Sequence, residues 1–117
     1  MTSVNDDGVA SGDVRTAGRW TVVTPPAELD PSTSPALREH LEILHEGGVT
    51  DMAVDWREVT FFDSSAIGVL MGLHKRLLDA GGAMVVICPA GRGRRLFDLM
   101  ALDQVFTFVD TESDLPA

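Results

Sequence analysis

The sequence predicts a single α/β domain in which a sheet carries packed helices. Short apolar runs bounded by proline, glycine or polar residues alternate with longer runs of helical spacing, a pattern typical of parallel strands joined by helical crossovers. The chain has 117 residues, of which 44% are hydrophobic and 23% charged, the balance of one ordinary globular domain. A domain of this size buries roughly two thirds of the surface that its unfolded chain exposes. Its core therefore needs no disulfide, and the lone Cys88 can form none within the chain.

The two ends of the chain are expected to lie outside this domain. Residues 1–18 are polar and rich in Gly, Ser and Asp, which predicts a flexible N-terminal arm or, at best, a weak edge strand over residues 9–14. We expect the domain proper to occupy residues 19–110. Residues 111–117 then form a C-terminal tail that is too short for a full helix.

The first half of the domain predicts a strand followed by a helix. Residues 20–24 are β-branched or aromatic, and Pro25 and Pro26, which lack amide donors, end the strand. Capping side chains and a proline suited to a first helical turn occupy residues 30–35. The helix that follows has apolar residues at helical spacing and stops at two glycines: Leu37, Leu41, Leu44, Gly47 and Gly48.

The second half continues the alternation. An apolar run at residues 52–56 is typical of a central strand covered on both faces. A helix is expected from Ser64 or Ser65 to about Ala80, and a strand at residues 84–87. The last elements are a strand at residues 105–109 and, before it, a helix near residues 94–100. Its apolar residues are expected in the core: Leu96, Phe97, Leu99 and Met100.

Charge and hydropathy exclude several classes of function. Nine basic and eighteen acidic residues give a net charge of −9, which repels nucleic-acid phosphates and anionic lipid. No window approaches the roughly 18 consecutive apolar residues of a membrane span, and the polar start lacks the apolar core of a signal peptide. We therefore expect a cytoplasmic protein that neither binds nucleic acid directly nor inserts into a membrane. No set of His, Cys and carboxylate residues has metal-ligand spacing, so no metal and no cofactor are expected.

Residues 59–70 depart most from a generic α/β sequence, because Asp63, Ser64 and Ser65 place one carboxylate and two hydroxyls at a helix start. A helical wheel puts one apolar arc toward the core: Ile67, Leu70, Met71, His74, Leu77 and Leu78. The opposite arc is expected to face outward: Ser65, Val69, Gly72 and Arg76, with Leu73 at its flank.

This outward stripe is small and apolar, unlike the polar face of an isolated surface helix. Gly68 and Gly72 each weaken the helix by ~1 kcal/mol relative to alanine. A surface that another backbone approaches closely would offset that cost. The stripe therefore predicts a partner-binding surface that includes Val69, Gly72 and Leu73.

The two serines allow two interpretations. In the simpler one, a serine only caps the helix, as serines commonly do. In the other, a solvent-facing serine accepts a phosphate, which carries about −1.5 to −2 charge and must be desolvated when an apolar partner docks. The outward apolar stripe favours the second interpretation.

Several of these segments, taken in order, resemble the STAS family of anti-sigma factor antagonists. They are Glu28-Leu29-Asp30, the run from Phe61 to Leu70, Gly81-Gly82, and Arg94-Arg95-Leu96-Phe97-Asp98-Leu99. The resemblance extends from Arg19 to about Val109. It implies a mixed sheet of four to five strands with three to four helices packed on it.

The resemblance also implies a partner-switching role without catalytic activity. The unphosphorylated protein would bind an anti-sigma factor that is itself a serine kinase, freeing a sigma factor, and a serine phosphatase would reset the system. The kinase would modify the first serine after the aspartate, which is Ser64 here. Asp30 and Asp63 would lie with Ser64 in the docking surface, and Ser65 and Gly68 would shape the helix start.

The chain departs from the family pattern at three places. Ala66 stands where glycine is usual, so the phosphoacceptor turn is altered. Ala27 replaces a glycine before Glu28, and Pro25 and Pro26 replace strand residues. The C-terminal helix of the family is nearly absent after Asp110, which could expose sheet surface or leave room for a partner.

Other functions remain open at this point. A STAS subunit could dock on a membrane transporter ATPase and regulate it without phosphorylation. The run from Gly91 to Arg95 could bind an anion or a nucleotide, although it lacks the ending of a phosphate-binding loop. Nucleophilic catalysis by Ser64 and His74 is excluded, because nearly 15 Å of helical rise separates them.

Overall fold

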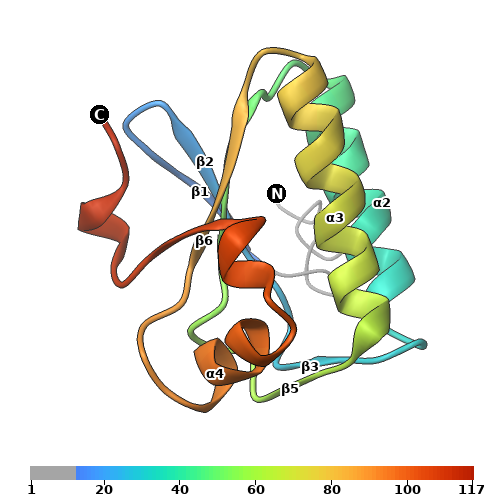
Figure 1. Cartoon of the computed structure of the whole chain (residues 1–117). Helices are drawn as coiled ribbons and strands as arrows, with labels where there is room; N and C mark the ends of the chain where they lie inside the picture. Colours follow the sequence, from blue (N-terminus) through green and yellow to red (C-terminus); the bar gives the residue numbers. More distant parts are fainter. Residues whose placement is uncertain (1–12) are drawn as a thin grey trace.

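The computed structural model describes residues 13–117, and these residues form a five-stranded sheet with helices α2 and α3 side by side against it (Figure 1). The strand order is β1-β2-β4-β6-β7, with β1 and β2 antiparallel and the other neighbours parallel. The predicted mixed α/β sheet is confirmed. In chain order the elements are β1 (Asp13–Ala17), β2 (Trp20–Thr24), β3 (Glu28–Leu29), α2 (Ser34–Glu46), β4 (Asp51–Asp55), β5 (Phe61–Phe62), α3 (Ser64–Asp79), β6 (Ala83–Ile87), α4 (Arg92–Leu99), a 3-10 helix (Leu102–Gln104), β7 (Thr107–Val109) and a second 3-10 helix (Glu112–Asp114).

The edge strand β1 lies within the segment for which the sequence favoured a flexible arm. It pairs with β2 from Asp13 opposite Thr24 to Ala17 opposite Trp20, and Gly18 makes the hairpin turn at a φ of 61°. Of the weak edge strand expected over residues 9–14, Asp13 and Val14 belong to β1, which continues to Ala17. Residues 1–12 lie outside the described part of the chain.

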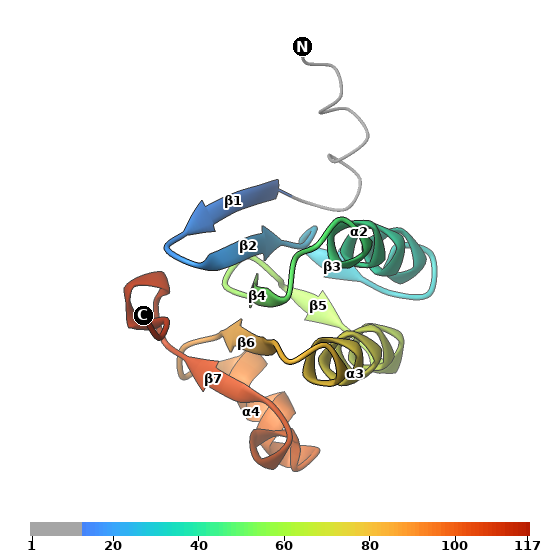
Figure 2. The ribbon, with the colours of Figure 1, turned by 90° about the horizontal axis from the view of Figure 1, so that it is seen from above.

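The two faces of the main sheet are covered differently, as Figure 2 shows with α2 and α3 on one side and the C-terminal tail on the other. The helical face holds the larger hydrophobic cluster. The smaller cluster on the opposite face contains Trp20, Val22, Ala53, Val85 and Ile87, with Leu115 of the tail packed against it.

The C-terminal tail takes part in the fold, although no full helix follows Asp110. The indole Nε1 of Trp20 donates to the carbonyl oxygen of Pro116 at 2.6 Å. Arg15 donates from Nε and Nη2 to Glu112 at 3.0 and 2.7 Å. Residues 111–117 therefore cover sheet surface that the missing helix could have left exposed.

Helix α4 exposes most of the apolar residues that the sequence placed in the core. Phe97 is fully buried, but Leu96, Met100 and Leu99 are 39%, 46% and 76% exposed, so that prediction was wrong for three of the four. The helix has only eight residues and inserts a single side chain into the core. Phe97 packs against Trp56 and Phe62, with ring centroids 5.5 and 5.0 Å apart.

A buried carboxylate joins β4 to the hairpin and to the tail. Asp55 is 3% exposed and accepts from Arg57 Nε at 2.9 Å and from Arg15 Nη2 at 2.8 Å. Burial alone would favour the neutral acid, but the hydrogen bonds from Arg57 and Arg15 outweigh it and hold the pKa of Asp55 below its ordinary value. The ionised form is therefore the one that this network stabilises.

We expect Asp55→Asn to lower the free energy of unfolding by about 2–4 kcal/mol at neutral pH, since Arg15 and Arg57 lose their buried ionised partner and keep only Glu112. Because the pKa of Asp55 is lower in the folded state, its contribution is present above the ordinary value of 3.8 and is lost as the pH falls through the folded pKa. Urea denaturation at neutral and progressively lower pH measures both effects. The variant should lose less stability on acidification than the wild type. Asp79→Asn, at an exposed position, is the control and should follow the wild-type profile.

Candidate functional site

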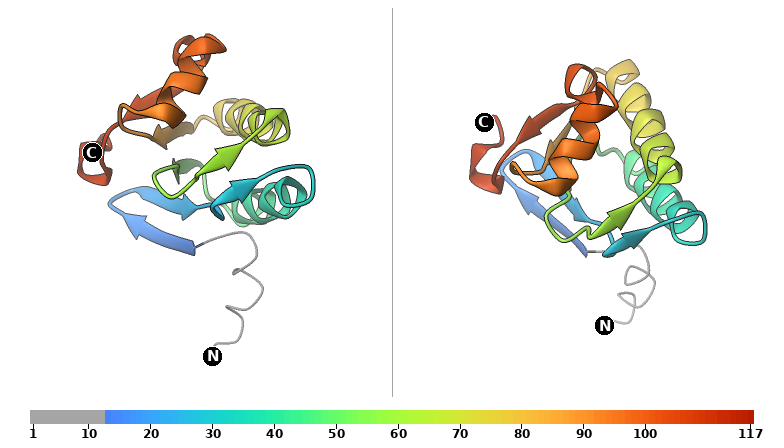
Figure 3. Two further views of the ribbon diagram at one scale, coloured as in Figure 1. Left: turned by 90° about the horizontal axis from the view of Figure 1, so that it is seen from below. Right: turned by 60° about the horizontal axis from the view of Figure 1, so that its bottom comes forward.

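A small parallel sheet positions the start of α3. Strand β3 pairs with β5, with Glu28 opposite Phe61 and Leu29 opposite Phe62, at the end of the molecule where α2 and α3 both begin (Figure 3). These two-residue strands were not predicted from the sequence. Because β3 and β5 run in parallel, Asp30 and Asp63 follow their carboxyl ends at the same edge. The amide of Asp63 also donates to the carbonyl oxygen of Leu29 at 3.3 Å.

Asp63 caps helix α3 and leaves Ser64 as its first residue. The Asp63 Oδ1 atom accepts from the amide of Ser65 at 2.9 Å and from the Ser65 hydroxyl at 2.5 Å. The cap is therefore the carboxylate, and neither serine takes the capping role that the simpler interpretation gave them.

Ser64 and Ser65 have opposite environments. Ser65 is half-buried, and its Oγ lies 2.8 Å from the Oγ of Ser34, which is only 2% exposed. Since the Ser65 hydroxyl donates its proton to Asp63, Ser34 donates to Ser65. The Ser64 side chain is exposed, and within residues 13–117 its hydroxyl makes no hydrogen bond. The structure thus separates one hydroxyl that holds the helix start from one that faces solvent.

Ser34 is a site residue that the sequence analysis missed. It lies in the first turn of α2 and joins that turn to the first turn of α3 through the Ser34–Ser65–Asp63 chain of hydrogen bonds. A serine is common at a helix start, so its position in the sequence was not unusual. No local sequence pattern could connect Ser34 to Ser65, which lies 31 positions later in the chain.

Asp30 lies in the neighbouring turn and is engaged locally. Its Oδ1 accepts from the amide and the hydroxyl of Ser32 at 2.8 and 2.6 Å, and from the amide of Thr33 at 3.2 Å. The hydrogen bonds from Ser32 are the main cause that lowers the pKa of Asp30 from its ordinary value. Asp30 and Asp63 therefore lie at the same edge of the small sheet as Ser64. Each carboxylate accepts hydrogen bonds from backbone amides of the turn that follows it.

The orientation expected for α3 was wrong at Val69 and Leu73. Both are buried, at 3% and 4% exposure, whereas Met71 and Leu78, expected in the core, are 44% and 53% exposed. Helix α3 packs against α2 as well as the sheet, so its buried arc is turned toward α2. The buried residues are Ala66, Val69, Leu70, Leu73 and Leu77.

The outward face of α3 nevertheless carries the small residues that suggested a contact surface. Ser64, Gly68, Met71, Gly72 and Lys75 are all exposed and lie on one arc of the helix. A Cβ atom built at Gly68 or Gly72 would meet nothing within 4 Å, so these glycines are not required by packing within the described chain. The exposed stripe therefore begins at Ser64 and has no side chain at Gly68 and Gly72, while Met71 and Lys75 project from it.

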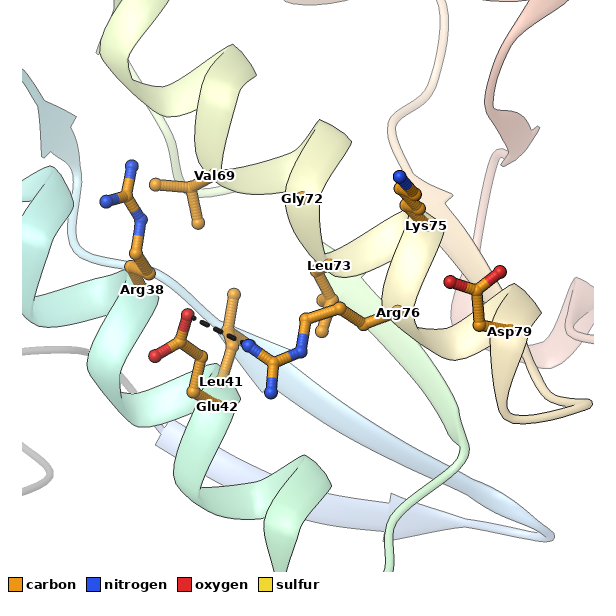
Figure 4. A pocket seen from close by; sticks show the side chains of 9 residues that line it. All are labelled: Arg38, Leu41, Glu42, Val69, Gly72, Leu73, Lys75, Arg76 and Asp79. Carbon is orange, nitrogen blue, oxygen red and sulfur yellow. Dashed lines mark hydrogen bonds and ion pairs between the residues drawn. The ribbon is translucent and has the colours of Figure 1, made fainter.

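A groove between α2 and α3 adjoins this stripe (Figure 4). Val69 and Leu73 lie at its floor with Leu41, and Gly72 belongs to both the groove and the stripe. Arg76 crosses it to reach Glu42 Oε2 at 3.3 Å. The groove is lined by Arg38, Leu41, Glu42, Val69, Gly72, Leu73, Lys75, Arg76 and Asp79.

The other candidate groups lie apart from this surface. Cys88 is buried, and desolvation raises the pKa of its thiol to about 11, so the thiol is unreactive at neutral pH. The His74 ring packs edge-on against Phe106 at 5.5 Å. Across residues 13–117, no group of His, Cys, Asp and Glu is arranged to hold a metal ion. None of the helices in this range is long and apolar enough to cross a bilayer.

Comparisons with known proteins agree on one family. The family model of the STAS domain matches residues 12–115. The anti-sigma-B factor antagonist of Bacillus subtilis is 33% identical over 78 residues, which cover 67% of this chain and 71% of that protein. The anti-sigma-B factor antagonist of Listeria monocytogenes is 27% identical over 88 residues, covering 75% and 77%. An anti-sigma factor antagonist from Mycobacterium paratuberculosis, a solved structure, has a TM-score of 0.79 at 24% identity, covering 87% of this chain and 86% of that one.

Proposed function

The chain belongs to the STAS domain family, and from this premise we propose that it is an anti-sigma factor antagonist controlled by phosphorylation of Ser64. The unphosphorylated form binds an anti-sigma factor that is also a serine kinase, and the sigma factor held by that protein is released. A serine phosphatase removes the phosphate and restores binding. The protein acts in the cytoplasm as a binding partner, without catalytic activity and without contacting nucleic acid.

The observation that carries this proposal is the exposed Ser64 hydroxyl at the first position of α3. Its neighbour Ser65 is held by Asp63 and Ser34, so of the two serines at this helix start Ser64 is the one free to enter the active site of another protein. In the transfer, Ser64 Oγ bonds to the γ-phosphorus of ATP, the bond to the ADP oxygen breaks, and a base of the kinase takes the hydroxyl proton.

The docking surface that we propose surrounds this hydroxyl. Gly68 and Gly72 let the backbone of the partner approach α3 closely, and the groove floor offers apolar contact beside them. The names of the relatives from Bacillus and Listeria support an anti-sigma factor as the partner. The proposed contact residues are Asp30, Asp63, Ser64, Ser65, Gly68 and Gly72, whereas Val69 and Leu73, at 3% and 4% exposure, contribute only to the floor of the groove.

Phosphorylation is expected to act on the interface more than on the fold. The phosphate adds about −1.5 to −2 charge at a helix N-terminus, where the helix dipole stabilises an anion. Asp63 and Asp30 oppose it from the same edge. A docked partner would have to desolvate this dianion, and a penalty of several kcal/mol lowers affinity by orders of magnitude.

Incubation with the cognate kinase and ATP tests the assignment of the phosphoacceptor. We expect intact-mass spectrometry to show one added phosphate and peptide mapping to place it on Ser64. Ser113→Ala serves as the control and should still accept it, while Ser64→Ala should not. A phosphate on another residue, or none while the kinase modifies a control substrate, would contradict the proposal.

A further inference from the structure

A buried hydroxyl at the start of α2 contacts the turn that carries the proposed phosphoacceptor. Ser34 is 2% exposed and, with Asp55, is one of two buried polar or charged residues among residues 13–117. Asp55 binds two arginines, whereas the Ser34 hydroxyl has within this range a single hydrogen-bond partner, the Ser65 hydroxyl at 2.8 Å. Burial of a hydroxyl is unfavourable unless the group is hydrogen-bonded. The bond to Ser65 is therefore the contact that stabilises a serine at this buried position.

The Ser34–Ser65 bond joins the first turns of two helices. On the α2 side, the amide of Ser34 donates to the carbonyl oxygen of Asp30 at 2.9 Å, so Ser34 belongs to the turn that Asp30 begins. On the α3 side, Ser65 donates from its amide and its hydroxyl to Asp63. Within residues 13–117, the other side-chain hydrogen bond between α2 and α3 lies about three turns further along α3. The Ser34–Ser65 bond therefore fixes the start of α3 relative to α2.

Ser64 lies between the two residues that these hydrogen bonds hold. The amide of Asp63 donates to the carbonyl oxygen of Leu29 at 3.3 Å, and Ser65 is held from the α2 side by Ser34. Successive residues of a helix are about 100° apart around its axis, so a rotation of the first turn changes the direction in which Ser64 points. The Ser34–Ser65 bond opposes that rotation, because the two hydroxyl oxygens separate when the turn rotates.

We propose that Ser34 is a positioning residue for the phosphorylation of Ser64, an inference that rests on the proposed function. By holding Ser65, it fixes the direction of the Ser64 hydroxyl relative to the surface on which the kinase docks. Without the Ser34 hydroxyl the Asp63 cap still forms, so α3 keeps its start, but its first turn can shift against α2. Phosphoryl transfer needs the acceptor oxygen in line with the γ-phosphorus, and a misplacement on the order of 1 Å slows such a step strongly.

Steady-state kinetics with the cognate kinase and ATP, at varied concentrations of the full chain, measure this effect. Ser34→Ala should lower kcat for phosphorylation of Ser64 about tenfold and leave KM within about twofold of the wild type, because the exposed docking surface is unchanged. Ile87→Val is the matched control, since it also removes one buried heavy atom but lies on the opposite face of the sheet, and it should keep both constants. A wild-type kcat for folded Ser34→Ala, or an equal loss in the control, would overturn the proposal.

A double-mutant cycle tests whether Ser34 acts through Ser65. Ser65→Ala removes the partner of the Ser34 hydroxyl, so it should lower kcat at least as much as Ser34→Ala does. Adding Ser34→Ala to Ser65→Ala should lower kcat no further, because the same hydrogen bond is already lost. Two losses that multiply in the double variant would show that Ser34 acts by another route.

NMR relaxation dispersion on the unphosphorylated full chain measures the position of the turn without a kinase. In Ser34→Ala the amides of Ser64, Ser65 and Ala66 should show exchange on the microsecond to millisecond timescale that the wild type and Ile87→Val lack. A first turn as rigid as in the wild type would overturn the inference while leaving the proposed switch intact. Absence of phosphate on Ser64 of the wild type would instead contradict the proposed function.

Discussion

Replacing Ser64 by aspartate is expected to weaken binding to the anti-sigma factor by at least about 100-fold, an effect worth roughly 2.7 kcal/mol. The carboxylate adds a charge beside Asp63 and Asp30, in a surface that must lose water when the partner docks. The fold itself should tolerate the change, because Ser64 is exposed and the N-terminus of a helix stabilises an anion. Isothermal titration calorimetry gives the affinity, and thermal denaturation reports whether the domain remains intact.

Two variants separate a local effect at Ser64 from a general effect of added charge. Ser64→Ala removes the phosphoacceptor without adding charge, so it should bind at least as tightly as the wild type and stay bound in the presence of ATP. Ser113→Asp adds the same charge to the C-terminal tail, which lies on the face of the sheet opposite α2 and α3 (Figure 2), and should bind normally. Wild-type affinity for a folded Ser64→Asp protein would show that the partner does not contact this hydroxyl.

The start of the central helix could be predicted because its signals are local. Asp63, Ser64 and Ser65 supply capping groups directly before an apolar run of helical spacing, and the structure begins α3 at Ser64. The strands with β-branched or continuous apolar runs were found for the same reason. The sequence could not show which of the three side chains caps the helix. That depends on side-chain geometry, and the hydrogen bonds of the folded chain identify Asp63 as the cap.

The direction in which α3 faces could not be read from its own residues. A helical wheel orders side chains around the axis, but α2 covers one side of α3 and turns the buried arc toward Val69 and Leu73. The same limit applies to α4, where Leu96 and Leu99 look like core residues until the position of the helix is known. Strands β3 and β5 are two residues long, too short to produce a periodic pattern.

Phe97→Ala is expected to lower the free energy of unfolding by about 3–5 kcal/mol, the range for deleting a fully buried aromatic ring. Phe97 is 0% exposed and stacks on Phe62 at 5.0 Å, and it also contacts Trp56. Leu78→Ala is the matched control, because the sequence placed both residues in the core while the structure leaves Leu78 53% exposed. Chemical denaturation should show a change within about 0.5 kcal/mol for that control. Equal losses for the two variants would contradict the packing described for α4.

The same substitution is expected to reach the proposed docking surface through β5. Phe62 ends the strand that leads into Asp63 and Ser64, and its ring packs against Trp56 and Phe97, which also contact each other. With Phe97 removed, the turn before α3 loses its anchor, so the backbone amides of Asp63 and Ser65, which donate to Leu29 and to the Asp63 carboxylate, should exchange with solvent faster in the folded variant. Hydrogen exchange measured by NMR distinguishes local opening of this turn from a uniform loss of stability. In local opening, the amides of the turn lose more protection than the amides of β6 and α2, which keep the protection set by the global free energy of unfolding. A turn that exchanges no faster than those elements would mean that the cap formed by Asp63 and Ser65 holds the helix start without support from the aromatic cluster.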